Sequence, residues 1–280
     1  MTNLHAPSTT PAVASAAQNR WARFDRWWLL FFAVLFLVVA LVLLAPKPYG
    51  DIWNFVKDGI IVTLKISIVS FFFILIVGVL GGMARVSHNR FLNLLSSLYV
   101  EVVRGIPVLV WLLWIWYALP QVRDSVGTAV ASAMPTLGNA ILGVKFPPFT
   151  AAVIGFTVAY GAYMTEIFRA GIQSIPRGQM EAARSLGMSY FQSMRHIILP
   201  QAFRVILPPL GNEFVTLLKD SSLVSVLAVS DLTRRGREYV ARSFLSFDTF
   251  TLIALLYLVL TLFFTRVFTA VERQMAVDKR

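Results

Sequence analysis

The side chains best suited to chemistry in this sequence are polar and ionisable groups inside otherwise apolar segments. Glu213 lies beside Asn212 in the stretch PPLGNEF, and Lys219, Asp220 and Ser221 end the same segment. Charged groups are costly at membrane depth, and where they occur they mark solute or ion paths. We therefore predict that these five residues line a substrate pathway, in which Glu213 binds the ammonium or a side-chain cation of the solute. Two structural alternatives stay open: Glu213 caps freed backbone amides, and Lys219 and Asp220 lie at a membrane interface.

A further carboxylate, Glu166, lies near the end of another apolar segment, three residues before Arg169. Residues three apart are neighbours on a helix surface. This spacing favours an ion pair at the membrane boundary over a contact with a solute.

Several kinds of chemistry are excluded by what the 280 residues lack. There is no cysteine, the three histidines are far apart, and no nucleotide-binding or hydrolase motif occurs. We therefore expect no catalysis, no metal site and no cofactor bound by this chain. The net charge of +11 does not indicate nucleic acid, because the basic residues flank apolar segments instead of forming a run with aromatics.

The elements that must position these groups are membrane helices. Apolar residues make up 57% of the chain and charged residues only 14%, whereas soluble domains average about a quarter charged. A spanning helix needs about 20 apolar residues. The sequence predicts an all-α integral membrane protein with about six spans: Trp27–Ala45, Ile60–Met83, Tyr99–Leu119, Phe149–Phe168, Ala202–Lys219 and Phe250–Phe268. The fifth is the weakest, because Pro208 and Pro209 break it.

Orientation follows from the Lys and Arg residues that flank the spans, since these concentrate on the cytoplasmic side. If both termini are cytoplasmic, 15 such residues, Arg104 among them, lie inside and 8 outside. The segment 231–242 is an exception, with four arginines outside. It packs on the protein in a specific way, or the fifth span does not cross fully. Residues 1–26 read as a disordered cytoplasmic tail, and 27–45 as an anchor rather than a cleaved signal.

The longest cytoplasmic segment, 169–201, is predicted to hold two short helices. Pro176 and Gly178 supply a turn before a helix over Gln179–Leu186. Met180, Ala183 and Gly187 form a narrow face of that helix suited to a partner's groove, and Gly187 ends it as a left-handed cap.

A second helix over Tyr190–Ile198 follows, with Ser189 and Gln192 in a capping-box pattern. Leu199-Pro200 is expected to stop this helix at the membrane. A connecting loop with incidental helicity is the alternative, but loops this long are usually functional or disordered, and the caps argue against disorder.

The same segment carries a recognisable pattern. EAA at 181–183 is followed by Gly187 and by IILP at 197–200. This resembles the EAA motif of the permease subunits of ATP-binding cassette (ABC) importers. The stretches YVEVVRGIPVLVWLLWIWY, YMTEIFRAGIQSIPRGQMEAARSLGMS and LPQAFRVILPPLGNEFVTLLKDSSLVSVLAV look like the polar amino acid branch of that family. The resemblance covers residues 59–275 and leaves the 27–45 helix as an addition to the usual core.

The resemblance implies a type I (MetI-like) permease fold and a coupling role for segment 169–201. In this family the helix with the motif docks into a cleft of a separate ATP-hydrolysing subunit. Glu181 would pair with a basic group there, Ala182 and Ala183 would allow close approach, and Gly187 would permit the turn between helices. Implied partners are a pair of ATP-binding subunits carrying ATP and Mg²⁺, a second permease subunit, identical or related, and a solute-binding protein outside the membrane.

The sequence thus predicts a permease subunit in a bacterial inner membrane that imports a polar amino acid. A secondary transporter driven by an ion gradient is the alternative, because it would also explain Glu213 and a broken helix. It predicts inverted repeats, which we do not find, and no docking segment. Acidic, basic and amide amino acids are not distinguished as substrates.

Overall fold

The computed structural model describes residues 26–276, so the predicted tail 1–26 lies almost entirely outside the described residues. Within that range the chain is helical and has no strand. The elements are α1 Arg26–Leu44, η2 Pro46–Gly50, α2 Asp51–Val86, α3 Arg90–Arg104, α4 Val108–Leu113, η3 Trp114–Ala118, α5 Leu119–Ala133, α6 Pro135–Leu142, α7 Pro148–Gln173, α8 Arg177–Ser185, α9 Tyr190–Ser193, η4 Met194–Ile198, α10 Leu199–Asp220, η5 Ser221–Leu227, α11 Leu232–Ser243 and α12 Ser246–Ala276.

Four helices of the described range are long and apolar enough to cross a membrane, namely α1, α2, α7 and α12. A fifth span results if α3 is counted together with the helix that begins at Val108. The prediction of one continuous span over Tyr99–Leu119 is wrong, because the chain bends by 101° between these two helices. Gly105 and Pro107 lie at the bend, and Pro107 has an extended backbone with ψ 142°. A proline disfavours helical geometry at the residue before it.

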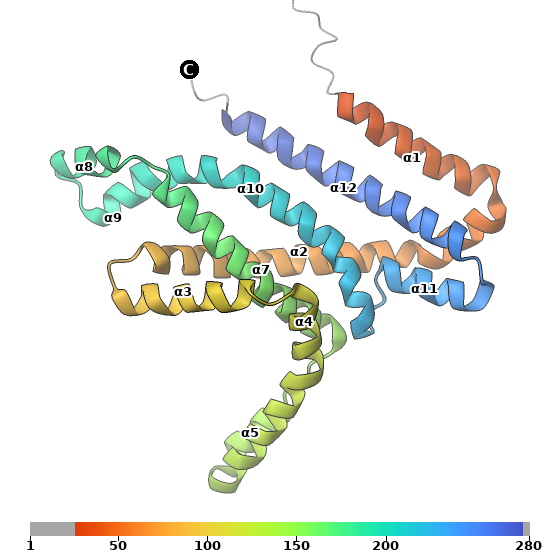
Figure 1. Cartoon of the computed structure of the whole chain (residues 1–280), viewed down its shortest axis with the longest axis horizontal. Helices are drawn as coiled ribbons and strands as arrows, with labels where there is room; N and C mark the ends of the chain where they lie inside the picture. Colours follow the sequence, from red (N-terminus) through yellow and green to blue (C-terminus); the bar gives the residue numbers. More distant parts are fainter. Residues whose placement is uncertain (1–25, 277–280) are drawn as a thin grey trace, which may run out of the picture.

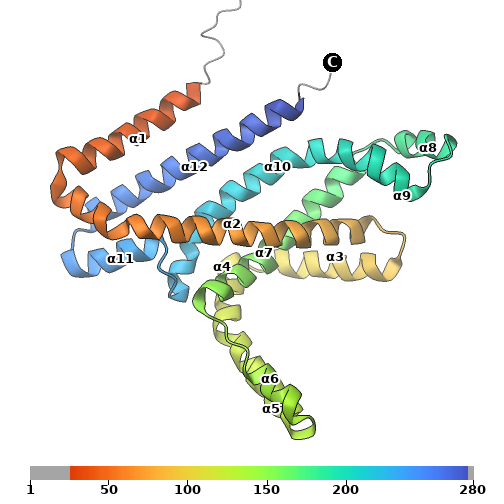
Figure 2. The ribbon, with the colours of Figure 1, turned by 180° about the vertical axis from the view of Figure 1, so that it is seen from behind.

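The helices lie in a bundle with two distinct ends (Figures 1 and 2). The helices α8 and α9 lie at one end, together with the turn between α2 and α3, and α11 lies at the other. Both α1 and α12 have their outer termini on the side away from α11. This arrangement is compatible with both termini on one side of a membrane. The hairpin of α5 and α6 protrudes from the bundle.

The central contact of the bundle joins α2 to α7 through glycines. A Cβ added at Gly78 would lie 2.2 Å from Cγ of Met164, and one at Gly82 would lie 2.5 Å from Cβ of Phe168. Small residues let two helix backbones approach closely where lipid offers no hydrophobic driving force. Gly155 of α7 meets Leu112 in the same way, since a Cβ added there would lie 2.6 Å from a methyl carbon of Leu112.

The arginine-rich helix α11 packs on the protein, which is the first of the two alternatives predicted for segment 231–242. It lies against α2 and α12. Two of its four arginines have acidic partners: Arg234 pairs with Glu238 at 2.9 Å, and Arg235 pairs with Asp58 of α2. The other two, Arg237 and Arg242, are exposed.

Candidate coupling segment and solute path

The helix α8 ends in the left-handed cap that the sequence predicts. Gly187 has φ +84°, a conformation that costs glycine no steric strain. Its N–H donates to the carbonyl of Arg184 at 3.0 Å, and the N–H of Met188 donates to the carbonyl of Ala183 at 3.1 Å. This pair of bonds is the Schellman motif, and it fixes the direction in which the chain leaves α8.

Two of the three residues in the predicted docking face of α8, Met180 and Ala183, point inward, whereas Gly187 is exposed. The prediction that this face enters a partner's groove is corrected for these two residues. Ala183 is only 4% exposed, and Met180 packs against the core cluster that contains Met194 and Ile198. These side chains are taken up by the chain's own η4. The exposed residues of this segment include Glu181, Ala182 and Leu186, and Leu186 is 84% exposed.

The capping box that begins α9 is confirmed. Ser189 Oγ accepts from the N–H of Gln192 at 3.2 Å, and Gln192 Oε1 accepts from the N–H of Ser189 at 2.8 Å. Two exposed aromatic side chains, Tyr190 and Phe191, follow.

The predicted stop at Leu199-Pro200 is wrong, because α9 runs through η4 straight into α10. The wider π-helical turn of η4 carries the chain into α10, where Pro200 sits in the first turn and needs no N–H donor. The coupling segment is therefore mechanically continuous with a long bundle helix.

The predicted break in that helix is also wrong. It runs without interruption from Leu199 to Asp220 and contains Pro208 and Pro209. Prolines are tolerated in membrane helices when neighbouring helices support the backbone. The neighbouring helix here is α12, which packs closely beside the prolines: a Cβ added at Gly211 would be 2.8 Å from Cγ of Phe268.

The predicted pathway residues divide into two groups. Glu213 is partly buried and lies within electrostatic range of Arg104 and Asp220, and Asp220 accepts a hydrogen bond from the Tyr160 hydroxyl at 2.6 Å. Asn212 and Lys219 are exposed. Ser221 is buried, and its hydroxyl donates to the carbonyl of Leu218 at 2.7 Å. The structure thus gathers Glu213 and Asp220, and not the other three, into one polar cluster.

Sequence reasoning missed two members of this cluster, Tyr160 and Arg104. Tyr160 was hidden among the small residues of its segment. Arg104 was assigned to the cytoplasmic side, but it ends α3 far from the turn between α2 and α3 and stacks over the Tyr163 ring at 5.0 Å. The sequence could have indicated Arg104, because this arginine immediately precedes an apolar, Trp-rich stretch.

Glu166 forms the ion pair that its spacing favours, and it adds a second partner. Its carboxylate contacts Arg85 Nη1 at 2.5 Å and Arg169 Nε at 2.9 Å. Arg85 belongs to α2 and Glu166 to α7, so the pair fastens these two helices near the end where α8 lies. Between residues 26 and 276, no three His, Asp or Glu side chains are grouped to hold a metal ion.

Comparison with known proteins then decides the class. Residues 74–277 match the family described as binding-protein-dependent transport system inner membrane component. The chain belongs to this family. It is a permease subunit of an ABC importer and a multi-pass inner-membrane protein. The helix α1 lies before the matched range, as does the outer part of α2.

Two curated relatives and two solved structures agree. The glutamine transport system permease protein GlnP of Escherichia coli (strain K12) is 34% identical over 220 residues, or 79% of this chain and 92% of that protein. The L-cystine transport system permease protein TcyB of Bacillus subtilis (strain 168) is 39% identical over 191 residues, or 68% of this chain and 73% of that protein.

The structure titled "Crystal structure of an amino acid ABC transporter with histidines" has a TM-score of 0.69 and 36% identity, covering 82% of this chain and 97% of its own. An inward-facing MetNI methionine ABC transporter has a TM-score of 0.64 at 22% identity, covering 80% and 98%. The permease therefore has the type I importer fold.

Proposed function

We propose that this permease imports a polar amino acid, that α8 and α9 couple it to a separate ATPase, and that both of its termini are cytoplasmic. The observation that carries the proposal is the exposed tip of α8, with Leu186 and Glu181 facing outward, on a segment continuous with α10. The glutamine, cystine and histidine named for similar proteins support a polar amino acid as substrate.

The coupling mechanism assigns one task to each part of the segment. Leu186 enters an apolar cleft on the ATP-binding subunit, Glu181 pairs with a basic group beside it, and Ala182 permits close approach. Ala183 and Gly187 act indirectly, because they hold α8 on η4 and set its turn. Movement of the docked helix is transmitted through η4 to α10. ATP and Mg²⁺ bind on the partner pair, and ATP shifts the permease between states only as far as it binds one state better.

The solute path uses the polar cluster of opposite charges. Arg104 suits the carboxylate of an amino acid, and Glu213 with Asp220 suits its ammonium or a cationic side chain. Arg104, Asn212 and Lys219 are exposed on the single chain, as expected of half a pathway that a second permease subunit, identical or related, completes. Tyr160 and Ser221 position the end of α10. A solute-binding protein delivers the amino acid from the side of α11.

We divide the chain into a tail at 1–26, an added membrane helix at 27–45, and a permease domain over 59–275. The permease domain contains the coupling segment at 169–201. Without Arg104, which lies in the polar cluster, 14 of the 15 Lys and Arg residues first counted inside remain, against 8 outside, and this excess supports cytoplasmic termini.

The coupling proposal is tested with Leu186→Asp in the complete transporter reconstituted with its ATPase and binding protein. Because Leu186 is 84% exposed, the variant keeps its fold and membrane insertion, and we expect ATP-driven uptake to fall at least tenfold. Leu186→Met, which keeps the apolar contact, is the matched control and retains uptake. Unchanged uptake by Leu186→Asp would overturn the coupling role. Uptake by the lone chain under a proton or sodium gradient, without ATP, would overturn ATP-driven import.

A further inference from the structure

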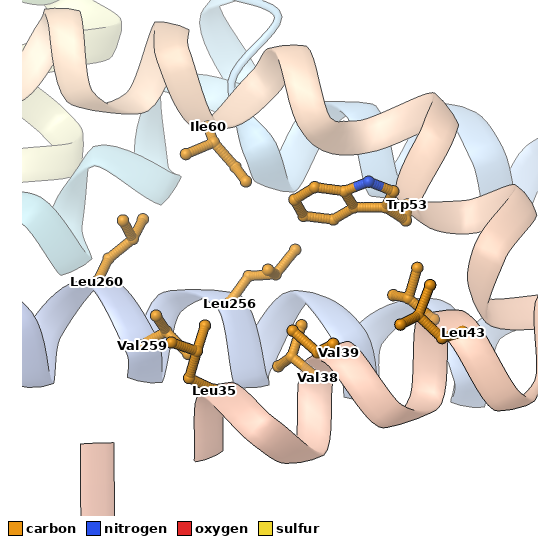
Figure 3. Close-up of a pocket in the computed structure, with 10 residues that line it drawn as sticks. Leu35, Val38, Val39, Leu43, Trp53, Ile60, Leu256, Val259 and Leu260 are labelled. Carbon is orange, nitrogen blue, oxygen red and sulfur yellow. The ribbon is translucent and has the colours of Figure 1, made fainter. Parts of the chain in front are cut away.

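An apolar groove lies between α1, α2 and α12, near the turn that joins α1 to α2 (Figure 3). It has a volume of about 330 Å³, and every residue that lines it is aliphatic except Trp53. Figure 3 shows side chains of α1 and α12 on one side of this space, with Ile60 and Trp53 of α2 on the other. None of the lining side chains carries a charge.

The groove has a closed floor and an open side. Val38 and Leu256 form the floor, each 5% exposed, whereas Val39 is 45% exposed and Leu43 is 70% exposed. The opening exists because α1 packs along α12, and the turn Pro46–Gly50 holds α1 away from α2. The open side therefore faces the surroundings of a membrane span.

The depth of the groove fits one leaflet. Leu43 and Leu35 mark its extent along α1, and eight residues of helix span about 12 Å. Half of the hydrocarbon core is about 15 Å thick. The groove thus starts at the α1–α2 turn and ends before the middle of the bilayer.

A positively charged side chain, that of Lys47, lies at the end of the groove near the α1–α2 turn. Lys47 lies in the α1–α2 turn between Leu43 and Trp53, is exposed, and has no acidic partner among the described residues. The other lysine at this end, Lys57, donates instead to Asn54 at 3.1 Å. Trp and Tyr at such positions are typical of the membrane interface, and here they are Trp53 and Tyr49.

We propose that this groove binds one acyl chain of a glycerophospholipid from the leaflet at the α1–α2 turn, with its phosphate on Lys47. Water is excluded because a buried water needs two to four polar partners, and the lining offers only the indole N–H of Trp53. An empty groove would leave its walls without van der Waals contacts on one side. The charge of Lys47 complements a phosphate at the level where a lipid headgroup lies. The groove is lined by α1 and the outer part of α2, which precede the matched family segment 74–277, and by α12, which lies within it. The inference rests on the lining side chains and on Lys47, and not on the proposed transport mechanism.

The test uses the complete transporter in vesicles of phosphatidylethanolamine and phosphatidylglycerol that contain a phosphatidylglycerol with a diazirine on its acyl chain. After irradiation, cross-links are mapped by peptide mass spectrometry. We expect labelling of the lining positions of α1 and α12 to exceed that of the exposed α2 positions Ile68 and Phe72 several-fold.

Matched variants separate a built site from bulk lipid. Val39→Trp fills the groove and lowers its labelling several-fold, whereas Leu37→Trp, on the same helix, equally exposed at 46% and outside the groove, leaves it unchanged. Lys47→Glu weakens competition by unlabelled phosphatidylglycerol, and Lys57→Glu does not. Equal labelling of the two tryptophan variants means annular lipid only and overturns the proposal. A groove unlabelled while Ile68 and Phe72 are labelled means that a protein segment fills it, which also overturns the proposal.

Discussion

Two helix pairs of this permease are built in opposite ways. The pair α2–α7 is joined by Gly78 and Gly82, whose Cα atoms lie against Met164 and Phe168, and by the ion pair of Arg85 with Glu166. The pair α1–α12 has no such glycine contact, and the groove opens beside it. In its most apolar window α7 is 61% buried, whereas α1 is 17% buried.

The difference between the two helix pairs shows that the hydrophobicity of a span does not determine how deeply it is buried. The most hydrophobic span, α1, is among the least buried, and the least hydrophobic of the four, α7, is the most buried. In lipid, a leucine gains little from meeting another leucine, and association depends on close packing of small residues and on polar contacts. The glycines and the Glu166 ion pair therefore mark the structural centre, and α1 is a peripheral helix whose missing contacts lipid supplies.

The largest expected effect comes from breaking the glycine contact. Gly78→Leu places a side chain where Met164 Cγ would lie 2.2 Å from the new Cβ, so α2 and α7 must separate. Overpacking of this kind typically costs about 1–3 kcal/mol, occasionally more, and we expect the upper end. The measurement is the thermal unfolding midpoint and the monodisperse fraction in mild detergent.

The control for this change is Val79→Leu, the next residue along, which is 37% exposed and on the outer side of α2. It should leave both readouts unchanged. If Gly78→Leu is as stable as the wild type, the contact between α2 and α7 is as loose as that between α1 and α12. That result would contradict the contrast drawn between the two helix pairs.

The sequence was sufficient for features formed within a few residues. Gly187, and Ser189 with Gln192, make their hydrogen bonds inside one turn of chain, so their types and spacing predict the cap and the capping box. The spans at 27–45 and 250–268 follow from composition, and the EAA pattern identifies the family.

Features that depend on distant partners could not be predicted in this way. The close packing of α10 on α12 beside Pro208 and Pro209 depends on Gly211 meeting Phe268. The bond between Tyr160 and Asp220 joins residues 60 apart in the chain. The inward face of α8 depends on how η4 folds back beneath it. None of these contacts has a local signature.

A second effect concerns α11, which holds the outer half of α2 where α7 does not. A Cβ added at Gly59 would lie 2.8 Å from the Leu232 Cα. Next to it Asp231 is fully buried, and its carboxylate accepts from the N–H groups of Thr233 and Arg234 at 3.0 and 3.1 Å. Burial raises the pKa of Asp231 to about 6, although these backbone bonds and the hydroxyls of Thr233 and Tyr257 oppose the shift.

The sign of the pH dependence follows from this shift. Because the folded pKa of Asp231 is above the ordinary value of 3.8, the folded state holds the proton more tightly than the unfolded state. Stability is then greatest below about pH 4 and falls as pH rises to about 6, by at most about 3 kcal/mol at about 1.4 kcal/mol per pKa unit. Asp231→Asn keeps an amide oxygen for the cap and should remove this loss, so its unfolding midpoint relative to wild type should rise from pH 4.5 to 7. A constant difference between the two proteins over that range would show that Asp231 does not titrate there.

The smallest effect separates the floor of the groove from its open side. Val38 is 5% exposed and packs with Leu252 and Leu256, whereas its neighbour Val39 is 45% exposed at the opening. Val38→Ala removes protein packing and should lower the free energy of unfolding by about 1 kcal/mol, measured by thermal unfolding in detergent with lipid added. Val39→Ala should change it by less than about 0.5 kcal/mol, because a mobile acyl chain adjusts to the lost methyl groups where a packed side chain cannot. If Val39→Ala costs as much as Val38→Ala, the opening is packed by protein, and α1 is held as firmly as α7.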